Sequence, residues 1–322
     1  MVYILTVNNN WSIEDYKEMI NEGVSAFRIN AVHATDDTLL RLKKVKSMFQ
    51  NRVTFYVDLP GRKTRIWSKN KSREQISAGE IFRVSFKESD ARFWISNCEI
   101  LNDIEADAKL IVRRVKRNNF ELRIVSIDKE GMLLEALNDG IIGYGYHIYS
   151  ADIYKPNSDL SQDDIEQWKR VKGLNPEIVA LSFVDESSVV EQFKADYALP
   201  EEKIYAKIES RYAVEHIVQI ANRADGLIIG RDDLGAFFQK NEIENIIEYI
   251  AKIANDKYIP MICASNYFQN IYDMFKLTDE DYDDFKRAYS NKAQAIYINE
   301  TNKDVDWRKY LLVSKQLETI NL

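Results

Sequence analysis

Cysteine, histidine and long hydrophobic runs are scarce in this sequence of 322 residues. The two cysteines, Cys98 and Cys263, lie far apart and offer neither a disulfide framework nor a metal-ligand spacing. The three histidines are too few and too scattered for a zinc site. No apolar run reaches the roughly 18 residues of a membrane span, and the N-terminus lacks the basic region and cleavage site of a secretory leader. We therefore expect a cytoplasmic protein with no membrane partner.

The formal net charge of −7 argues against a nucleic-acid-binding protein, although cations gather locally. Residues 62–73 carry six cations around Trp67, and 113–117 form a second basic run. Such runs are usually solvated faces. The sharper interpretation is that they bind an anionic second substrate. A single tryptophan among the cations does not make the aromatic series of a nucleic-acid site.

Eight short runs rich in β-branched or aromatic residues alternate with amphipathic segments. They are YILTVN (3–8), SAFRIN (25–30), VTFYVDL (53–59), EIVALSF (177–183), KIYAKIE (203–209), GLIIG (226–230), PMICAS (260–265) and AQAIYIN (293–299). Because parallel strands need long crossovers and eight of them can close a sheet, the pattern predicts an α/β fold of the (β/α)₈ TIM barrel class. Seven buried strands with a different edge would give a doubly wound sheet instead. Ser12 is expected to cap the first helix.

The segment 61–156 has a different pattern. Strand-like runs recur in it without a long helical period, and turn signals fall at 118–119 and 138–140. The runs are IFRVSF (81–86), FWIS (93–96), FELRIVSI (120–127) and MLLEAL (132–137). We predict a small β-rich domain inserted after the third barrel strand, so that the barrel comprises 1–60 and 157–322. The insertion leaves from the functional face of a barrel, which suits a lid, although a mere embellishment would look the same.

Charged residues gather where two neighbouring strands of the predicted barrel end. Lys207 and Glu209 close the fifth run, and Asp232 and Asp233 follow the sixth. Two carboxylates at one edge can share a hard cation such as Mg²⁺ or Mn²⁺. Lys207 beside them would stabilise negative charge on a phosphoryl or enolate group. A purely internal Lys207–Glu209 ion pair would explain the same residues.

These residues lie in motifs that resemble those of the pyruvate kinase family. KIES (207–210) and ADGLIIGRDDLG (224–235) resemble its K-I-E-N and [AS]-D-G-I-M-V-A-R-G-D-L-G. Further likenesses run along the chain in order: 4–34 to the strand–helix–strand that ends in R-L-N-F-S-H-G, 57–66 to L-D-T-K-G-P-E-I-R, 181–193 to S-F-V-R, 260–274 to V-I-C-A-T-Q-M-L-E-S-M and 293–304 to A-D-C-I-M-L-S-G-E-T-A-K-G. The resemblance thus covers all eight strands, and the insertion lies where the family carries its lid, the B domain.

The resemblance implies roles for individual residues. The positions matching catalytic residues are Lys207, Arg28, Ser265 and Arg65. Glu209 and Asp233 match the ligands of Mg²⁺ or Mn²⁺, and the backbone of Asp232, Leu234 and Gly235 matches the segment that cradles the ligand carboxylate. Asn30 and Asp58 match two ligands of a K⁺ site, and His33 matches a residue near the nucleotide phosphates.

Several positions depart from the family pattern. Val32 and Leu59 stand where the family has a serine and a threonine, and neither offers a side-chain oxygen, which counts against a K⁺ site. In the lid, Arg113 and Arg114 replace an acidic turn, and 142–147 replace a segment with two lysines, so the use of a nucleotide is left open. The 143–146 segment is predicted as a tight strand turn rather than a phosphate loop.

The resemblance therefore implies a Mg²⁺-dependent transferase of pyruvate kinase-like chemistry that acts on phosphoenolpyruvate or pyruvate, both small molecules, through an enolpyruvate. A lyase, aldolase or transferase that uses the same enolate with another, anionic substrate is the alternative, and a non-enzymatic binding protein is the third interpretation. The sequence ends shortly after Asp304, so we expect no counterpart of the family's C-terminal regulatory domain. A homo-oligomer is left open.

Overall fold

The computed structural model describes residues 1–88, 91–96, 104–113, 120–150, 156–265, 267–268, 277–298 and 307–308. The chain divides into two compact units. The first comprises Met1–Gly61, Asn157–Leu234 and Lys240–Leu322, and the second comprises Arg62–Pro156 with Gly235–Gln239. Among the helices in the described ranges, none is long and apolar enough to cross a membrane.

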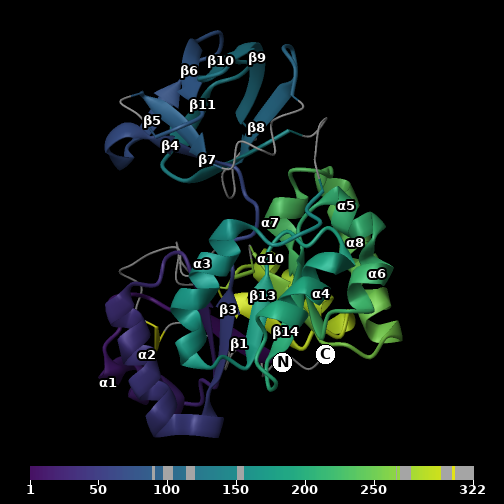
Figure 1. The fold of residues 1–322 in the computed structure, drawn as a ribbon. Coiled ribbons are helices and arrows are strands. Elements are labelled where there is room, and N and C mark those ends of the chain that lie inside the picture. Colours follow the sequence, from purple (N-terminus) through teal and green to yellow (C-terminus); the bar gives the residue numbers. More distant parts are fainter. Residues whose placement is uncertain are drawn as a thin grey trace. The chain divides into compact units, whose positions relative to one another are not determined.

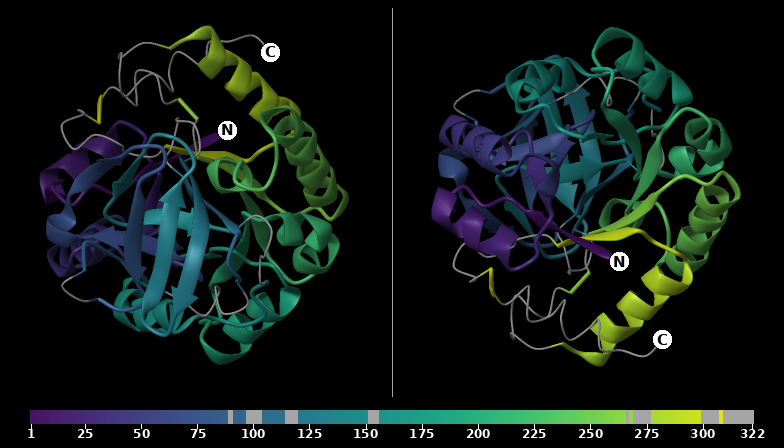
Figure 2. Two further views of the ribbon diagram at one scale, coloured as in Figure 1. Left: turned by 90° about the horizontal axis from the view of Figure 1, so that it is seen from above. Right: turned by 90° about the horizontal axis from the view of Figure 1, so that it is seen from below.

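The first unit is a closed barrel of eight parallel strands, and helices surround these strands (Figures 1 and 2). The strand order is β1-β17-β16-β15-β14-β13-β3-β2. Their bounds are β1 (Val2–Thr6), β2 (Ala26–Asn30), β3 (Thr54–Asp58), β13 (Ile178–Leu181), β14 (Lys203–Ile208), β15 (Gly226–Gly230), β16 (Met261–Ala264) and β17 (Ala295–Ile298). Seven of these strands lie entirely within a predicted run, and β1 begins one residue before its run. The predicted (β/α)₈ class is therefore confirmed.

The helices of the first unit follow the strands in alternation. They are α1 (Ile13–Asn21), α2 (Asp36–Phe49), α3 (Gln162–Val171), α4 (Ser187–Asp196), α5 (Arg211–Glu215), α6 (Ile217–Ala221), α7 (Arg231–Leu234), α8 (Lys240–Asp256) and α10 (Asp279–Ser290), with the 3₁₀ turns η1 (Gln50–Arg52) and η4 (Lys172–Leu174). Ser12 caps α1 as predicted, and Asp15 completes a reciprocal capping box. Helices α3 and α10 begin with the same device.

The interior of the barrel is filled by side chains from most of its strands. This buried set consists of Ile4, Ala26, Ile178, Ala180, Tyr205, Ile228, Ile262, Ala264, Ala295 and Tyr297. Small alanines among larger residues let the side chains of neighbouring strands interdigitate within the closed sheet. The barrel is therefore a packed core, and its chemistry must lie at a strand end.

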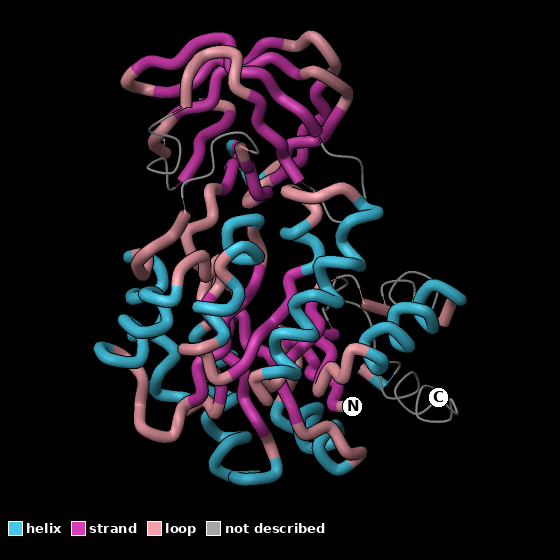
Figure 3. Tube along the Cα trace, turned by 90° about the vertical axis from the view of Figure 1, so that its right-hand side faces the viewer, coloured by secondary structure: helices cyan, strands magenta, loops and turns pink. Residues whose placement is uncertain are grey.

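As far as it is described, the second unit is built from strands and loops with one short 3₁₀ turn, η2 (Lys69–Lys71) (Figure 3). Its strands are β4 (Arg65–Ser68), β5 (Arg73–Ile76), β6 (Ile81–Ser85), β7 (Phe93–Ser96), β8 (Lys109–Arg113), β9 (Phe120–Asp128), β10 (Gly131–Ala136), β11 (Gly140–Gly143) and β12 (Tyr146–Tyr149). A small closed barrel has the order β10-β6-β7-β4-β12-β8-β9, and β11 pairs with β5 in a separate two-stranded sheet.

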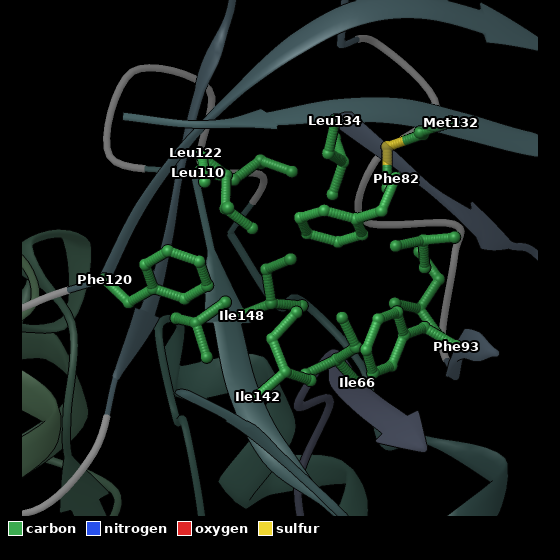
Figure 4. Close-up of a cluster of buried hydrophobic side chains, with 14 of the residues drawn as sticks. Ile66, Phe82, Phe93, Leu110, Phe120, Leu122, Met132, Leu134, Ile142 and Ile148 are labelled. Atoms are coloured by element: carbon green, nitrogen blue, oxygen red, sulfur yellow. The ribbon is translucent and has the colours of Figure 1, made fainter. Parts of the chain in front are cut away.

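A hydrophobic core of its own stabilises the second unit (Figure 4). It includes Ile66, Phe82, Phe93, Leu110, Phe120, Leu122, Met132, Leu134, Ile142 and Ile148. The four strand-like runs expected from the sequence correspond to β6, β7, β9 and β10. The sequence did not reveal β4, β5, β8, β11 and β12, and the turn signal at 118–119 falls outside the described residues.

Both connections between the units begin on residues that the barrel holds tightly. The Gly61 amide donates to Asp164 Oδ1 at 2.8 Å, and the Asn157 amide donates to Asp185 Oδ2 at 2.8 Å. Gly61 has a φ of +67°, and a Cβ there would lie 2.4 Å from the carbonyl oxygen of Ser182. Asn157 Nδ2 donates to the next carbonyl, that of Phe183, at 3.3 Å. The chain therefore leaves and re-enters the barrel beside consecutive residues that follow β13.

Candidate active site

Lys207 and Glu209 form a buried ion pair at the C-terminal end of β14. Lys207 Nζ lies 2.9 Å from Glu209 Oε1 and donates to Ser182 Oγ at 3.0 Å. The second oxygen, Glu209 Oε2, accepts the Phe183 amide at 2.8 Å, and only 1% of Glu209 is exposed. Phe183 has a φ of +53°, a strained value for a bulky side chain and one that functional sites often contain. The internal ion pair considered from the sequence therefore exists, and it fixes both charges at one end of the barrel.

A second cluster joins the first through Asp58, at the end of β3. Asp58 Oδ2 accepts from Arg28 Nε at 2.8 Å, lies 2.8 Å from Arg28 Nη2 and is 3.6 Å from Lys207 Nζ. Asp58 Oδ1 accepts the Tyr297 hydroxyl at 3.2 Å. The Arg28 guanidinium also lies 5.1 Å from the centre of the Tyr297 ring and donates to Thr6 Oγ1 at 3.3 Å. Two cations and two carboxylates thus share one continuous network.

The network sets the ionisation of its members. Burial alone would lower the pKa of Lys207, but the charges of Glu209 and Asp58 outweigh it and raise that pKa, with Asp233 acting in the same direction. Burial would also lower the pKa of Arg28, which Asp58 raises. Burial would raise the pKa of Asp58, and the charges of Arg28 and Lys207 bring it below its usual value. These three groups therefore stay charged near neutral pH.

The short helix α7, which carries Asp232 and Asp233, is anchored by its first residue. Arg231 makes two hydrogen bonds of 2.7 Å to the carboxylate of Asp284 on α10. Its guanidinium also lies 4.4 Å from the centre of the Tyr267 ring. The side chains of Arg231 and Asp284 are only 15% and 7% exposed. Burial would lower the pKa of Arg231, and the bonds to Asp284 raise it instead. The clamp fixes the backbone that presents both aspartates.

Glu209 and Asp233 are the two carboxylates that the sequence predicts as ligands of a hard cation. They follow the neighbouring strands β14 and β15. A Cβ at residue 230 would lie 2.5 Å from Glu209 Cγ, so Gly230 lets the end of β15 pack closely against the Glu209 side chain. Mg²⁺ is commonly bound by one or two carboxylates, with ligand and water oxygens completing its shell. No group of three or more His, Cys, Asp or Glu residues in the described part of the chain could hold a metal by itself. Both Glu209 oxygens are engaged, by Lys207 and by the Phe183 amide, so a cation at this pair would share those oxygens and would need ligand oxygens to complete its shell.

A family model described as pyruvate kinase, barrel domain, matches residues 4–303. The chain belongs to the pyruvate kinase family. The predicted membership is therefore confirmed.

Curated pyruvate kinases match over most of the chain. The enzyme of Thermoplasma acidophilum is 22% identical over 292 residues, 90% of this chain and 52% of that protein. That of Encephalitozoon cuniculi is 24% identical over 270 residues, 81% and 60% respectively, and that of Thermotoga maritima is 23% identical over 308 residues, 89% and 63%. The chain therefore spans between 52% and 63% of the lengths of these three relatives.

Several of the residues matched to pyruvate kinase motifs lie together at the end of the barrel. Arg28, Asp58, Lys207 and Glu209 lie in one network, and Asp233 is close enough for its charge to act on Lys207. Ser265 follows β16 with a φ of +69°. Their catalytic and ligand roles remain predictions.

Asn30 and His33 make contacts with residues close to them in the sequence. Asn30 Oδ1 accepts the Val32 amide at 3.2 Å, and the amide of the exposed His33 donates to the Asn30 carbonyl at 3.1 Å. Leu234 is fully buried in α7, whereas Gly235 belongs to the second unit.

The remaining predicted residues belong to the second unit. Arg65 on β4 donates to the Gly145 carbonyl at 2.9 Å, and it stands opposite His147 of β12 in the strand register. His147 also stands opposite residue 113 of β8, and its Nδ1 lies 2.8 Å from the Tyr149 hydroxyl. Arg114 lies outside the described residues. The strand register thus brings Arg65, His147 and residue 113 into one row across three strands.

The sequence missed several groups that complete the network. These are the Ser182 and Tyr297 hydroxyls, Thr6 Oγ1 and the Phe183 amide. Thr6 and Ser182 lie at or just after strand ends, which is a signal that could have identified them. Tyr297 lies inside an apolar run and the Phe183 contact is made by backbone, so neither has a signature in sequence.

Proposed function

We propose that this chain is a Mg²⁺-dependent phosphotransferase that interconverts phosphoenolpyruvate and pyruvate through an enolpyruvate. The observation that carries the proposal is the buried network of Arg28, Lys207, Asp58 and Glu209, with Asp233 beside it. Two oriented cations at the end of a barrel are suited to a ligand whose negative charge moves during the reaction. Their partners hold them in place, so little reorganisation is needed when that charge develops.

Each residue of the network has a task in this reaction. Lys207, protonated and fixed by Glu209 and Ser182, would donate its third hydrogen bond to the oxygen that joins the enol carbon to the phosphoryl group, where negative charge develops. Arg28, held by Asp58, would bind the phosphoryl oxygens. Bound at Glu209 and Asp233, a divalent cation would neutralise charge on the same oxygens as a Lewis acid.

Other residues would position the ligand and the reacting groups. The backbone of Asp232, Leu234 and Gly235 would hold the ligand carboxylate, and Ser265 would lie near the reacting carbon. In the forward direction the bond between phosphorus and the enol oxygen breaks, the acceptor's terminal phosphate oxygen bonds to phosphorus, and the enolate carbon takes a proton.

The second unit is proposed to act as the lid that holds the second substrate. Arg65 is proposed to bind the phosphates of a nucleotide or of another anion, and the sequence predicts the same role for Arg113, Arg114 and His33. Two features of this unit differ from the family pattern at the segment matched to its nucleotide contacts, so the identity of the anionic second substrate is left open. The 143–146 segment is a tight connection: Gly145 has a φ of +78°, and a Cβ there would lie 3.1 Å from the Trp67 ring. His147 lies in the segment that matches the family's two lysines, and its Nδ1 is 2.8 Å from the Tyr149 hydroxyl.

A coupled assay with ADP, Mg²⁺ and phosphoenolpyruvate tests the phosphoryl transfer. Lys207→Met is expected to lose roughly 10²–10³-fold in turnover, because one preorganised donor to the developing charge is removed. Lys203→Met, on the exposed start of the same strand, is the matched control and should keep wild-type turnover. Wild-type turnover equal to that of Lys207→Met would exclude this reaction.

Binding of oxalate, which mimics an enolpyruvate, separates the remaining alternatives. An aldolase or a lyase would give no transfer to ADP, yet Mg²⁺ with oxalate would still raise the melting temperature by mass action. Glu209→Gln and Asp233→Asn should each abolish that rise. A binding protein without the enolate site would show no rise in any of these forms.

A further inference from the structure

We propose that Tyr297, Asp58 and Arg28 form a triad that takes the place of the monovalent cation of the pyruvate kinase family, with Tyr297 as the residue that positions Arg28. This inference rests on the proposed function, since it concerns how Arg28 is held for the ligand. It follows from four observations at the ends of β2, β3 and β17.

First, both oxygens of Asp58 are engaged by the protein. Oδ2 lies 2.8 Å from two nitrogens of Arg28 and 3.6 Å from Lys207 Nζ, while Oδ1 accepts the Tyr297 hydroxyl. Asp58 is only 3% exposed. Two cations beside one buried carboxylate neutralise it and would repel a third cation, because charges interact strongly where water is excluded.

Second, the other positions of that cation site offer no free set of oxygens. Asn30 Oδ1 accepts the Val32 amide at 3.2 Å. Val32 and Leu59 have apolar side chains, and Leu59 is buried while its amide donates to the Ala180 carbonyl at 2.9 Å. A hard monovalent cation needs several oxygens to replace its hydration shell. The residues present do not fit K⁺.

Third, Tyr297 contacts both partners of the ion pair. Its hydroxyl donates to Asp58 at 3.2 Å, and its ring lies 5.1 Å from the Arg28 guanidinium. Tyr297 is 1% exposed and its ring meets Tyr56 edge to face at 6.2 Å, so it has little freedom to move. A fixed ring beneath a guanidinium and a fixed donor to its carboxylate together define where Arg28 can lie.

Fourth, the tyrosine is a departure from the family. In the alignment of 293–304 with A-D-C-I-M-L-S-G-E-T-A-K-G, Tyr297 falls on the methionine. A thioether offers neither a strong donor nor an aromatic face. The chain thus lacks two oxygen-bearing side chains of the cation site and has gained a side chain that orients the same arginine.

The test measures binding of Mg²⁺ and oxalate by thermal unfolding of the full chain. Titrations are run in KCl and in tetramethylammonium chloride at equal ionic strength. The triad predicts that the wild-type affinity for oxalate agrees within about twofold between the two salts, since no K⁺ site contributes. Tyr297→Phe, which keeps the ring, should weaken oxalate binding about tenfold, as expected for a lost hydrogen bond to a charged group.

Tyr56→Phe is the matched control, because it removes a neighbouring hydroxyl that none of the contacts in the described part of the chain joins to Asp58. It should leave the affinity for oxalate unchanged. Tighter binding in KCl by tenfold or more for the wild type would overturn the proposal, as would an unchanged affinity in Tyr297→Phe. These outcomes are read from binding and do not depend on turnover.

If oxalate fails to stabilise the wild type in either salt, the proposed function fails and the triad is judged on the ligand-free chain. Equal melting temperatures in the two salts, with a lower value for Tyr297→Phe than for Tyr56→Phe, support the triad. A stabilisation specific to K⁺ that disappears in Asp58→Asn overturns it.

Discussion

The clamp between Arg231 and Asp284 is expected to contribute strongly to the stability of the barrel. Both side chains are largely buried, and the pair is bidentate at 2.7 Å. Removing one partner of a buried pair leaves the other charge without compensation and costs about 3–5 kcal/mol. The loss of the contact with the Tyr267 ring adds about 0.5–1 kcal/mol. The residual exposure of the arginine offsets part of these two costs. Arg231→Met should therefore lower the free energy of unfolding by about 3–5 kcal/mol in total.

Urea unfolding followed by the helical circular dichroism signal measures this change, because the α-helices in the described residues belong to the first unit. The double variant Arg231→Met/Asp284→Leu is the control, since replacing both charges by apolar groups should be far less costly than removing one. The double-mutant cycle should give a coupling energy of about 2 kcal/mol or more. Additive single effects, or a loss below about 1 kcal/mol in Arg231→Met, would show that the clamp is solvent-screened.

Three further predictions test other parts of the structure. Gly61→Ala should destabilise the barrel by about 2–4 kcal/mol, measured by thermal unfolding, because the left-handed φ and the overlap with the Ser182 carbonyl act together. The lowered pKa of Asp58 means that its ionised form stabilises the fold above its unfolded-state pKa of about 3.9, and this contribution is lost as the pH falls through the folded value. The free energy of unfolding should therefore depend less on pH below about pH 4 in Asp58→Asn than in the wild type, as measured by urea unfolding at a series of pH values. Phe93→Ala should cost the second unit about 3–5 kcal/mol without changing the helical signal of the barrel, as seen by comparing near- and far-ultraviolet dichroism.

The barrel could be predicted from the sequence because its strands are buried on both faces. Runs such as GLIIG and PMICAS are continuous in apolar character, and the helices between them have a different period. Half of the second unit escaped prediction for the opposite reason. Strand β4 alternates buried Ile66 and Ser68 with partly exposed Arg65 and Trp67, and its cations resemble a solvated loop. Strands β11 and β12 are four residues long and are separated by two residues that include a glycine.

The candidate site was predictable where charged side chains end a strand. Arg28, Asp58, Lys207 and Glu209 all stand at or near the carboxyl ends of β2, β3 and β14, which lie within one stretch of four successive barrel strands, so topology alone brings them together. The role of Tyr297 was not predictable. A tyrosine among alanines and isoleucines is expected to be a core residue, and only the structure shows that its hydroxyl bonds to Asp58. The contact of the Phe183 amide depends on a positive φ at that residue. A phenylalanine in the sequence does not predict such a backbone conformation.

The two connections of the second unit have a consequence for how such a protein could diversify. Gly61 and Asn157 meet the backbone at Ser182 and Phe183, and each is tied down by its own buried carboxylate. The inserted segment therefore starts and finishes at adjacent points that the barrel itself defines. A gene rearrangement that exchanged everything between these two residues would keep the contacts of the Lys207–Glu209 pair with each other, with Ser182 and with the Phe183 amide, because all of these residues belong to the barrel. Proteins with the same barrel could in this way come to use a different second substrate by exchanging only the inserted segment.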